Sequence, residues 1–277
     1  MRRFYRLDDH REQALVYGGH DPCVCVLSMG ALVQLMRGEL GQSRSLSDEA
    51  IALAARVGHV PSVAHAAWYR AELGHILGDV AEAETRARET LAVASEKGIA
   101  HYAAWAVMLL GWAMVTRGDA DAGLAKMEEG RVALRATDNQ YHMPHRLTVR
   151  AQALAAAGRT DAARDAIDEA LASVARTGEV WYQPEVLRLK AEILQAAPAS
   201  DLAAAQRCLE QALAAARGHG ATFWELRAAV TLAGLLAAQG RPASARGVLA
   251  PALARFDGAR EMPEVARAFA LLDRLPV

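Results

Sequence analysis

Glycine recurs along this chain at intervals of 40 residues, and this repeat constrains the fold more than any other feature. One series comprises Gly38, Gly78, Gly118, Gly158 and Gly240. A second series comprises Gly18, Gly58, Gly98, Gly178, Gly218 and Gly258. Where the second series lacks a glycine the chain carries Asp138 and Asn139, and asparagine also tolerates the left-handed backbone of a helix C-cap. Because glycine closes helices, the two series predict two helix ends in every repeat, so the unit is a helical hairpin.

The residues between the glycines strengthen this interpretation. Counted from Gly158, small or apolar residues stand at positions +5, +9, +12 and +13, which lie on one helix face. The same count from Ser200, where the register has slipped by two residues, and from Gly240 finds alanine or leucine at every one of these positions. Alanine at +5 and +12 lets two helix axes approach closely. The turns after Gly38, Gly78 and Gly118 match less fully, and Gly130 is the +12 residue of the third.

Composition and charge exclude several classes of protein. The chain is 53% hydrophobic but only 5% aromatic, and its alanine and leucine content favours an all-α fold. With a formal net charge of −1, the chain lacks the excess of basic residues that is typical of a nucleic-acid-binding protein. We find no signal peptide and no apolar run of the roughly 20 residues that a membrane span needs. Three cysteines form no disulfide framework, so we expect a cytoplasmic protein with no nucleic-acid or membrane partner.

The alanine and glycine pattern resembles the tetratricopeptide repeat family, and Gly111 stands where that family favours a small residue in helix A. Ordinary tetratricopeptide units run about 34 residues, so the longer period here predicts longer helices. We therefore expect an all-α, right-handed α-solenoid of about six 40-residue tetratricopeptide-like hairpins, forming one continuous domain. The expected hairpins cover residues 20–58, 59–98, 99–138, 139–178, 179–220 and 221–258. Residues 1–19 are expected to form an orphan or capping helix, and residues 259–277 a second capping helix.

Several loop and helix segments carry a closer resemblance. They are His20-Asp21-Pro22, Leu110-Gly111-Trp112-Ala113, Arg176-Thr177-Gly178-Glu179, Trp181-Tyr182, Arg188-Leu189-Lys190, Glu225-Leu226-Arg227-Ala228-Ala229 and Gly240-Arg241-Pro242. Together they resemble the C-terminal repeat region of predicted bacterial ATPases associated with class III adenylate/guanylate cyclases. The resemblance implies the regulatory part of a signalling system and transfers no catalytic residue. The chain also lacks the phosphate-loop pattern G-x-x-x-x-G-K-[ST], so we expect no enzymatic activity.

The nearest approach to a metal site lies at His20, Cys23 and Cys25. On a helix the two cysteines would project about 200° apart, so they cannot easily share one ion. The pattern favours a helix start instead, with Asp21 as N-cap, Pro22 at the first helical position and at least one cysteine buried as a small hydrophobic residue. We therefore expect neither a metal nor a cofactor.

The family resemblance points to the concave face as a binding groove, because in tetratricopeptide solenoids fixed positions of helix A face inward. Counting these positions gives His65, Trp68, Glu72, His75, Trp105, Met108, Trp112, His145, Thr148, Gln152, Glu185, Arg188 and Glu192, and in the first repeat Cys25, Ser28 and Leu32. Three of the five tryptophans belong to this set, and exposed tryptophans are typical of binding hot spots. Whether they face the groove or pack in the core stays open.

These patterns predict a non-catalytic interaction or sensor module that binds a protein or peptide segment, or a small-molecule effector, in the groove. One alternative is a homodimeric architectural scaffold joined through exposed helix faces. Another, from a different class, is a stand-alone enzyme that uses Glu72, His65 and His75 beside the tryptophans.

Overall fold

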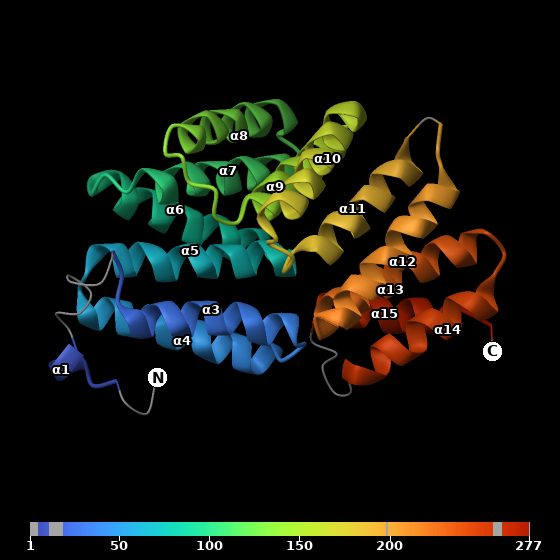
Figure 1. The fold of residues 1–277 in the computed structure, drawn as a ribbon, viewed down its shortest axis with the longest axis horizontal. Helices are drawn as coiled ribbons and strands as arrows, with labels where there is room; N and C mark the ends of the chain where they lie inside the picture. Colours follow the sequence, from blue (N-terminus) through green and yellow to red (C-terminus); the bar gives the residue numbers. More distant parts are fainter. Residues whose placement is uncertain (1–4, 11–18, 198, 257–261, 277) are drawn as a thin grey trace. The chain divides into compact units, whose positions relative to one another are not determined.

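The computed structural model describes residues 5–10, 19–197, 199–256 and 262–276, and their regular structure is entirely helical (Figure 1). Of the helix expected near the N-terminus, a short helix α1 (Leu7–His10) is seen. The rest of that expected helix, Gly18 and Gly258 lie outside the described residues. Within the part of the chain that is described, every helix is too short or too polar to cross a bilayer.

Twelve helices between Pro22 and Leu253 form six consecutive hairpins in the described residues. Three hairpins comprise α3 (Pro22–Met36) with α4 (Leu40–Val57), α5 (Val60–Leu77) with α6 (Val80–Glu96), and α7 (Ala100–Thr116) with α8 (Ala120–Arg135). The next three comprise α9 (Met143–Ala156) with α10 (Thr160–Thr177), α11 (Gln183–Ala196) with α12 (Leu202–Gly218), and α13 (Thr222–Ala238) with α14 (Pro242–Leu253). Helices adjacent in the sequence pack on one another from α4 to α8 and again from α9 to α14, which confirms the all-α repeat solenoid.

The contacts divide the chain into two compact units. Unit 1 consists of Met1–Leu35 and Glu39–Gln140, and unit 2 consists of Met36–Gly38 and Tyr141–Val277. Unit 1 therefore holds almost all of helices α3 to α8, and unit 2 holds helices α9 to α15.

The left-handed helix ends that the glycine series predicts are confirmed. Gly38, Gly58, Gly78, Gly98, Gly118, Gly158, Gly178 and Gly240 all have positive φ. Asp138, which replaces a glycine in the second series, has φ of 52°. The prediction for Gly218 is wrong, because α12 continues to that residue and Gly220 adopts φ of 64° instead. The two-residue slip at Ser200 therefore extends to the next helix end.

The small residues at positions +5 and +12 of each hairpin are buried in all six hairpins, including the three whose sequences matched less fully. They are Ser43 and Ala50, Ala83 and Thr90, Gly123 and Gly130, Ala163 and Ala170, Ala205 and Ala212, and Ala245 and Ala252. In the third hairpin, Gly123 and Gly130 lie on the face of α8 that meets α7, where a small residue lets the two backbones approach.

The closest helix approach that the glycines show is between α7 and α8. A β-carbon added to Gly111 would lie 2.6 Å from the carbonyl oxygen of Gly123, and one added to Gly130 would lie 2.7 Å from the carbonyl oxygen of Ala104. Both distances are shorter than real β-carbon contacts. Glycine at these positions is therefore required by packing, which compensates for its poor helix propensity of about 1 kcal/mol relative to alanine.

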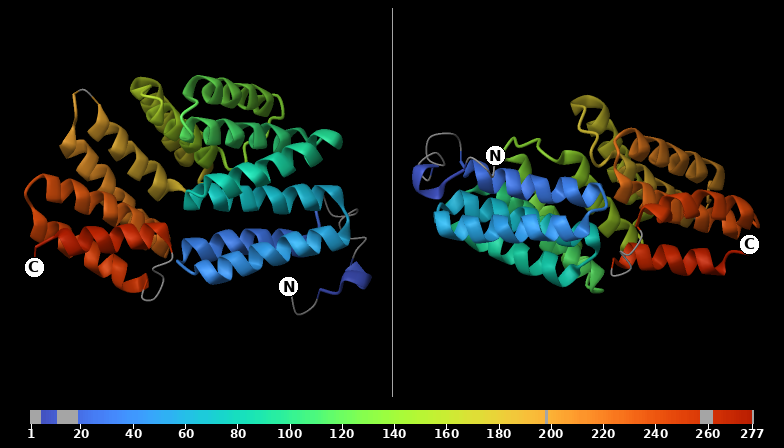
Figure 2. Two further views of the ribbon diagram at one scale, coloured as in Figure 1. Left: turned by 180° about the vertical axis from the view of Figure 1, so that it is seen from behind. Right: turned by 90° about the horizontal axis from the view of Figure 1, so that it is seen from below.

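Helix α15 (Pro263–Arg274) packs against α13 and α14 at the end of unit 2, and Figure 2 shows it in red beside them. Its Val265 and Ala268 are buried. The Arg246 side chain of α14 donates hydrogen bonds to the carbonyl oxygens of Leu272 and Leu275, at 3.3 and 2.7 Å. These bonds tie the C-terminal end of α15 to α14.

Candidate functional site

Seven of the residues expected to face a groove in unit 1 lie on α5 and α7, and all seven are buried. The other three lie on α3, where Ser28 and Leu32 are buried and Cys25 is half-buried. His65, Trp68, Glu72 and His75 belong to α5, and Trp105, Met108 and Trp112 belong to α7. The three indoles are 2%, 0% and 7% exposed. Of the two alternatives left open by the sequence, the structure therefore places the tryptophans in the core. These three tryptophans therefore do not line a groove that is open to solvent.

Contacts between these aromatic side chains hold α5 to α7. The Nδ1 atom of His65 lies 2.8 Å from the hydroxyl oxygen of Tyr102. The Trp68 ring packs against Tyr69 and Tyr102 with centroids 4.8 and 5.0 Å apart. Aromatic pairs at such distances stabilise a core beyond the area that they bury. Farther along the two helices, His75 meets Trp112 edge to face at 4.7 Å.

The physical reason for this burial is the composition of the first helices of the hairpins. Helix α7 carries no charged residue from Ala100 to Thr116, and a helix that is apolar on all sides is buried on all sides. The expected groove residues follow from a rule that assigns fixed positions of the first helix to an open concave face. Here bulky side chains fill the space between neighbouring helices.

In unit 2 the expected residues also lie in the interior, and they do not form one site. His145 and Thr148 are fully buried on α9 and Gln152 is half-buried. The Thr148 hydroxyl donates a hydrogen bond to the carbonyl oxygen of Pro144 at 2.7 Å, and the His145 ring packs against Tyr182 at 4.4 Å. These are contacts that position helices, and none of them presents a reactive group to solvent.

Glu185 and Arg188 of α11 form a buried, bidentate ion pair. The guanidinium Nε and Nη2 atoms each lie 2.8 Å from a carboxylate oxygen of Glu185, and Arg188 also pairs with Glu192. Arg227 of α13 reaches Glu185 at 3.0 Å. Burial alone would lower the pKa of Arg188, but the charges of the two glutamates hold it above its ordinary value. Because the charges compensate one another, the network joins α11 to α13 as a structural element.

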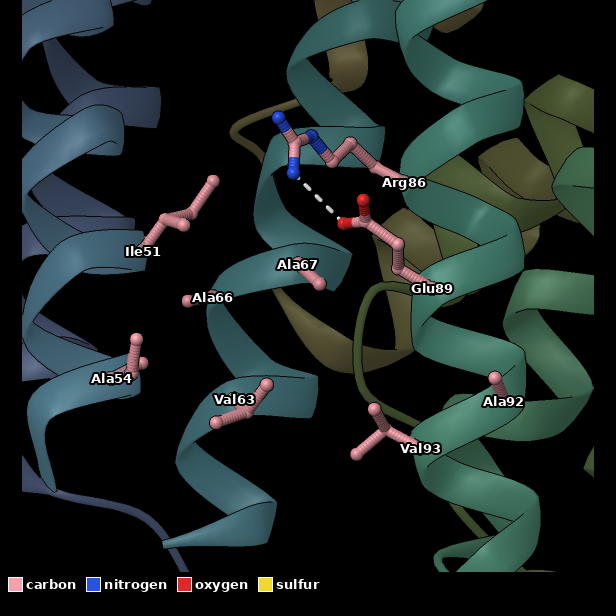
Figure 3. Close-up of a pocket in the computed structure, with 10 residues that line it drawn as sticks. Ile51, Ala54, Val63, Ala66, Ala67, Arg86, Glu89, Ala92 and Val93 are labelled. Atoms are coloured by element: carbon pink, nitrogen blue, oxygen red, sulfur yellow. Dashed lines mark hydrogen bonds and ion pairs between the residues drawn. The ribbon is translucent and has the colours of Figure 1, made fainter. Parts of the chain in front are cut away.

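The structure places an open apolar groove elsewhere in unit 1, on the side where α4 and α6 flank α5. This groove, the α4–α6 groove, has a volume of about 340 Å³ and is lined by Ile51, Ala54, Ala55, Val63, Ala66, Ala67, Arg86, Glu89, Ala92 and Val93. Figure 3 shows Ile51 and Ala54 on α4, Val63 and Ala66 on α5, and Val93 on α6. Its size falls within the range of about 300–1,000 Å³ typical of ligand pockets.

Two charged side chains stand at one end of the α4–α6 groove. Arg86 donates a hydrogen bond from Nη1 to Glu89 at 2.8 Å, which Figure 3 marks as a dashed line. Its Nε atom lies 3.3 Å from Glu82, which in turn accepts a hydrogen bond from Arg70 at 2.6 Å. Burial would raise the pKa of Glu82, but Arg70 and then Arg86 lower it below its ordinary value. The groove thus combines an apolar floor with a fixed polar end.

Sequence reasoning missed this groove, although a signal for it is present. Ala55 and Ala92 are exposed alanines on second helices of successive hairpins. Small exposed residues on facing helices leave room between them, whereas the residues expected to line a groove are mostly large side chains of the first helices. Nothing in the sequence alone separates such alanines from those that only serve helix propensity.

The expected start of α3 is confirmed, and with it the burial of one cysteine. The Asp21 carboxylate accepts hydrogen bonds from the backbone N–H groups of Cys23 and Val24 at 2.9 and 3.0 Å, and Pro22 is the first residue of the helix. Cys23 packs in an apolar cluster with Val24, Leu27, Ala50, Ala54 and Ala66. Cys25 points away from that cluster and is half-buried.

A second group of side chains meets where α3 and α5 begin. One ligand atom from each of His20, Cys25 and His65 lies within 4.8 Å of the others. Burial lowers the pKa of the His20 imidazole and raises that of the Cys25 thiol. The sequence suggests a grouping of His20 with the neighbouring cysteines and places His65 among the expected groove residues, so the meeting of these three side chains is not predicted from it.

Comparison of the sequence with models of known protein families and with curated proteins found no match.

Proposed function

We propose that this chain is a non-catalytic binding module that takes an apolar protein segment in the α4–α6 groove. The observation that carries the proposal is the groove itself, which is open, about 340 Å³ in volume and lined mainly by small apolar side chains. An amphipathic helix laid between two helices presents apolar residues at i, i+3 and i+4. Alanine-lined walls suit such a segment because they allow close backbone approach.

The charged end of the groove favours a partner that binds in one orientation over an apolar segment that binds in any orientation. The Arg86–Glu89 pair offers a cation and a carboxylate side by side. Polar groups of this kind fix the orientation of a ligand, while the apolar floor supplies contact area. A small apolar effector with one polar end would use the same features, and the experiment below distinguishes it from a protein segment.

The cellular role that we propose is the interaction or effector-sensing part of a bacterial ATPase/cyclase-type signalling system. This assignment is supported by the resemblance of the loop and helix segments and by the all-α repeat fold. In such a solenoid each hairpin contacts its neighbours, so a segment bound between α4 and α6 would favour one spacing of successive hairpins. The expected cytoplasmic location, and the expected lack of enzymatic activity and of nucleic-acid and membrane partners, belong to this proposal.

The test uses two exposed alanines of the same helix. A photo-cross-linking amino acid replaces Ala55, which lines the groove, or Ala52, which is exposed on α4 outside it. We expect position 55 to cross-link a defined segment of one protein, and position 52 not to. A cross-link to a small molecule at position 55 would identify an effector instead of a segment. Equal cross-linking from both positions would contradict the groove as the binding site.

A second candidate function, the homodimeric scaffold, is favoured by one surface of α3. Val26, Met29 and Val33 are 42%, 43% and 55% exposed and recur at helical spacing, so they form an apolar stripe. A two-fold contact through this stripe would cover it on both copies. Sedimentation equilibrium of wild type and Val33→Asp tests this, with Val132→Asp as control because Val132 is a single exposed valine of α8. A monomeric wild type would exclude the scaffold.

A further inference from the structure

The beginnings of α3 and α5 bring together side chains that ligate transition metals. His20 precedes α3, Cys25 lies in its first turn, and His65 lies on α5. One nitrogen or sulfur atom of each lies within 4.8 Å of the others. This cluster is separate from the α4–α6 groove, because none of its three residues lines the groove.

The repeat explains why these residues meet. Cys25 and His65 are 40 residues apart, so they occupy the same position in successive hairpins and face each other across neighbouring first helices. The backbone N–H of Asp21 donates a hydrogen bond to the hydroxyl oxygen of Ser62 at 2.7 Å, which ties the start of α3 to the start of α5. The cluster is therefore built on two fixed helix ends.

The ligand atoms available in this cluster are soft donors. Two imidazoles and one thiol are available, and the thioether sulfur of Met29 lies 3.7 Å from the sulfur of Cys25. The nearby carboxylate of Asp21 is engaged by two backbone N–H groups and by the Tyr5 hydroxyl at 2.7 Å. Thiolate, thioether and imidazole ligands select Cu⁺ and Zn²⁺, whereas Mg²⁺ and Ca²⁺ need oxygen ligands.

We propose that His20, Cys25 and His65 bind one Zn²⁺ or Cu⁺ ion. Three protein ligands leave one position, which Met29 or water occupies. On binding, the S–H bond of Cys25 breaks, its proton passes to the solvent and the thiolate bonds to the metal.

The geometry requires one modest rearrangement. Ligand atoms around a tetrahedral zinc are about 3.5 Å apart, as bond lengths near 2.0 and 2.3 Å dictate. The rings of His20 and His65 are stacked, with centroids 4.2 Å apart and planes 14° apart, so one ring must turn. His20 can turn, because it precedes the helix and is half-buried, and the outer torsion of histidine has a broad energy profile.

His65 is the fixed member of the site. It is 3% exposed on α5, and its Nδ1 atom is 2.8 Å from the hydroxyl oxygen of Tyr102 on α7. Hydrogen bonds of this kind orient metal-binding histidines, and their loss weakens metal affinity about 10- to 100-fold. The metal site thus extends across the starts of three successive first helices.

The experiment titrates the reduced full-length chain, freed of metal by chelation, with Zn²⁺ and with Cu⁺ against chromophoric competitors. Co²⁺ serves as the spectroscopic probe. We expect one equivalent of metal per chain and, with Co²⁺, a thiolate-to-metal charge-transfer band. Cys25→Ser removes that band, and Cys25→Ser and His20→Ala each weaken Zn²⁺ binding by at least about tenfold. Preference for either ion supports the site and identifies which of the two it holds.

Matched controls lie in unit 2. Cys208 of α12 is half-buried like Cys25, and His219 follows the same helix. Cys208→Ser and His219→Ala are expected to leave affinity and spectrum unchanged. The proposal is overturned if the wild type takes up no stoichiometric metal, or if Cys25→Ser retains the charge-transfer band.

An alkylation measurement on the wild-type chain avoids any effect of substitution on folding. Zn²⁺ is expected to slow the alkylation of Cys25, mapped by mass spectrometry, by at least about tenfold while Cys208 reacts as before. Burial raises the pKa of both thiols, so the two are a fair comparison. Equal rates at Cys25 with and without Zn²⁺ would overturn the proposal.

Discussion

Replacing Gly111 with alanine tests whether the close approach of α7 and α8 depends on glycine. An added β-carbon would lie 2.6 Å from the carbonyl oxygen of Gly123 and 2.8 Å from the backbone nitrogen of Met127. Ordinary van der Waals contact begins at 3.4 Å, so the contact with the carbonyl oxygen is short by about 0.8 Å. A third atom, the side-chain Cγ of Met127, would lie at 2.5 Å. The other two belong to the backbone of α8, and neither can move without separating the two helices.

The expected magnitude follows from two opposing effects. Alanine improves helix propensity by about 1 kcal/mol relative to glycine. Forcing an extra carbon into a packed interface costs about 1–3 kcal/mol, and the upper end applies here because backbone atoms obstruct. Gly111→Ala is therefore expected to lower the free energy of unfolding by about 2 kcal/mol.

Gly247 of α14 supplies the matched control. It also lies inside a helix, but an added β-carbon meets no atom within 4 Å. Gly247→Ala should therefore raise the free energy of unfolding by about 0.5–1 kcal/mol. The assay is urea unfolding followed by circular dichroism and by tryptophan fluorescence, which Trp105 and Trp112 of α7 report directly. If the two variants were equally stabilised, the reasoning about the α7–α8 interface would be refuted.

Three further predictions concern a helix end, a charge and a core residue. Asp138→Ala should destabilise by about 1–2 kcal/mol because φ is 52° there, whereas Asp138→Gly should not; thermal melts of both check this. Glu82→Gln should destabilise by about 1 kcal/mol at pH 7, where the partly exposed carboxylate pairs with Arg70. Because the folded pKa of Glu82 lies below its ordinary 4.5, that difference should persist above pH 4.5 and vanish as the pH falls through the folded value, in urea titrations at several pH values. Trp68→Ala should cost about 3–5 kcal/mol in unfolding experiments, and an unchanged stability would show that Trp68 is not a core residue.

The repeat, its helix ends and its small buried residues could be predicted because each depends on local chemistry. Left-handed conformation selects glycine or a residue such as Asp138, and close packing selects small residues at positions +5 and +12. The left-handed position after α12 is Gly220 and not the predicted Gly218, because two glycines two residues apart both satisfy the local rule. Only the packed length of the helix chooses between them.

The candidate sites could not be predicted in the same way, because they depend on how helices pair. Whether Trp68 faces solvent depends on what surrounds α5, which a helical count does not contain. The α4–α6 groove arises from the spacing between two helices whose alanines look ordinary in sequence. The proximity of Cys25 and His65 could be predicted from the sequence, since the repeat places both residues at one register position. The position of His20 could not, because it depends on the cap that starts α3.

The most direct test of the account is the affinity of the cross-linked partner segment for three forms of the chain. The measurement is isothermal titration calorimetry with the wild type, Ala55→Phe and Ala52→Phe. Both variants add the same side chain to one helix, but only the phenylalanine at position 55 fills the groove. We expect Ala55→Phe to weaken binding by about tenfold or more, while Ala52→Phe binds like the wild type and both variants fold normally. Equal affinity of all three forms would contradict the α4–α6 groove as the binding site.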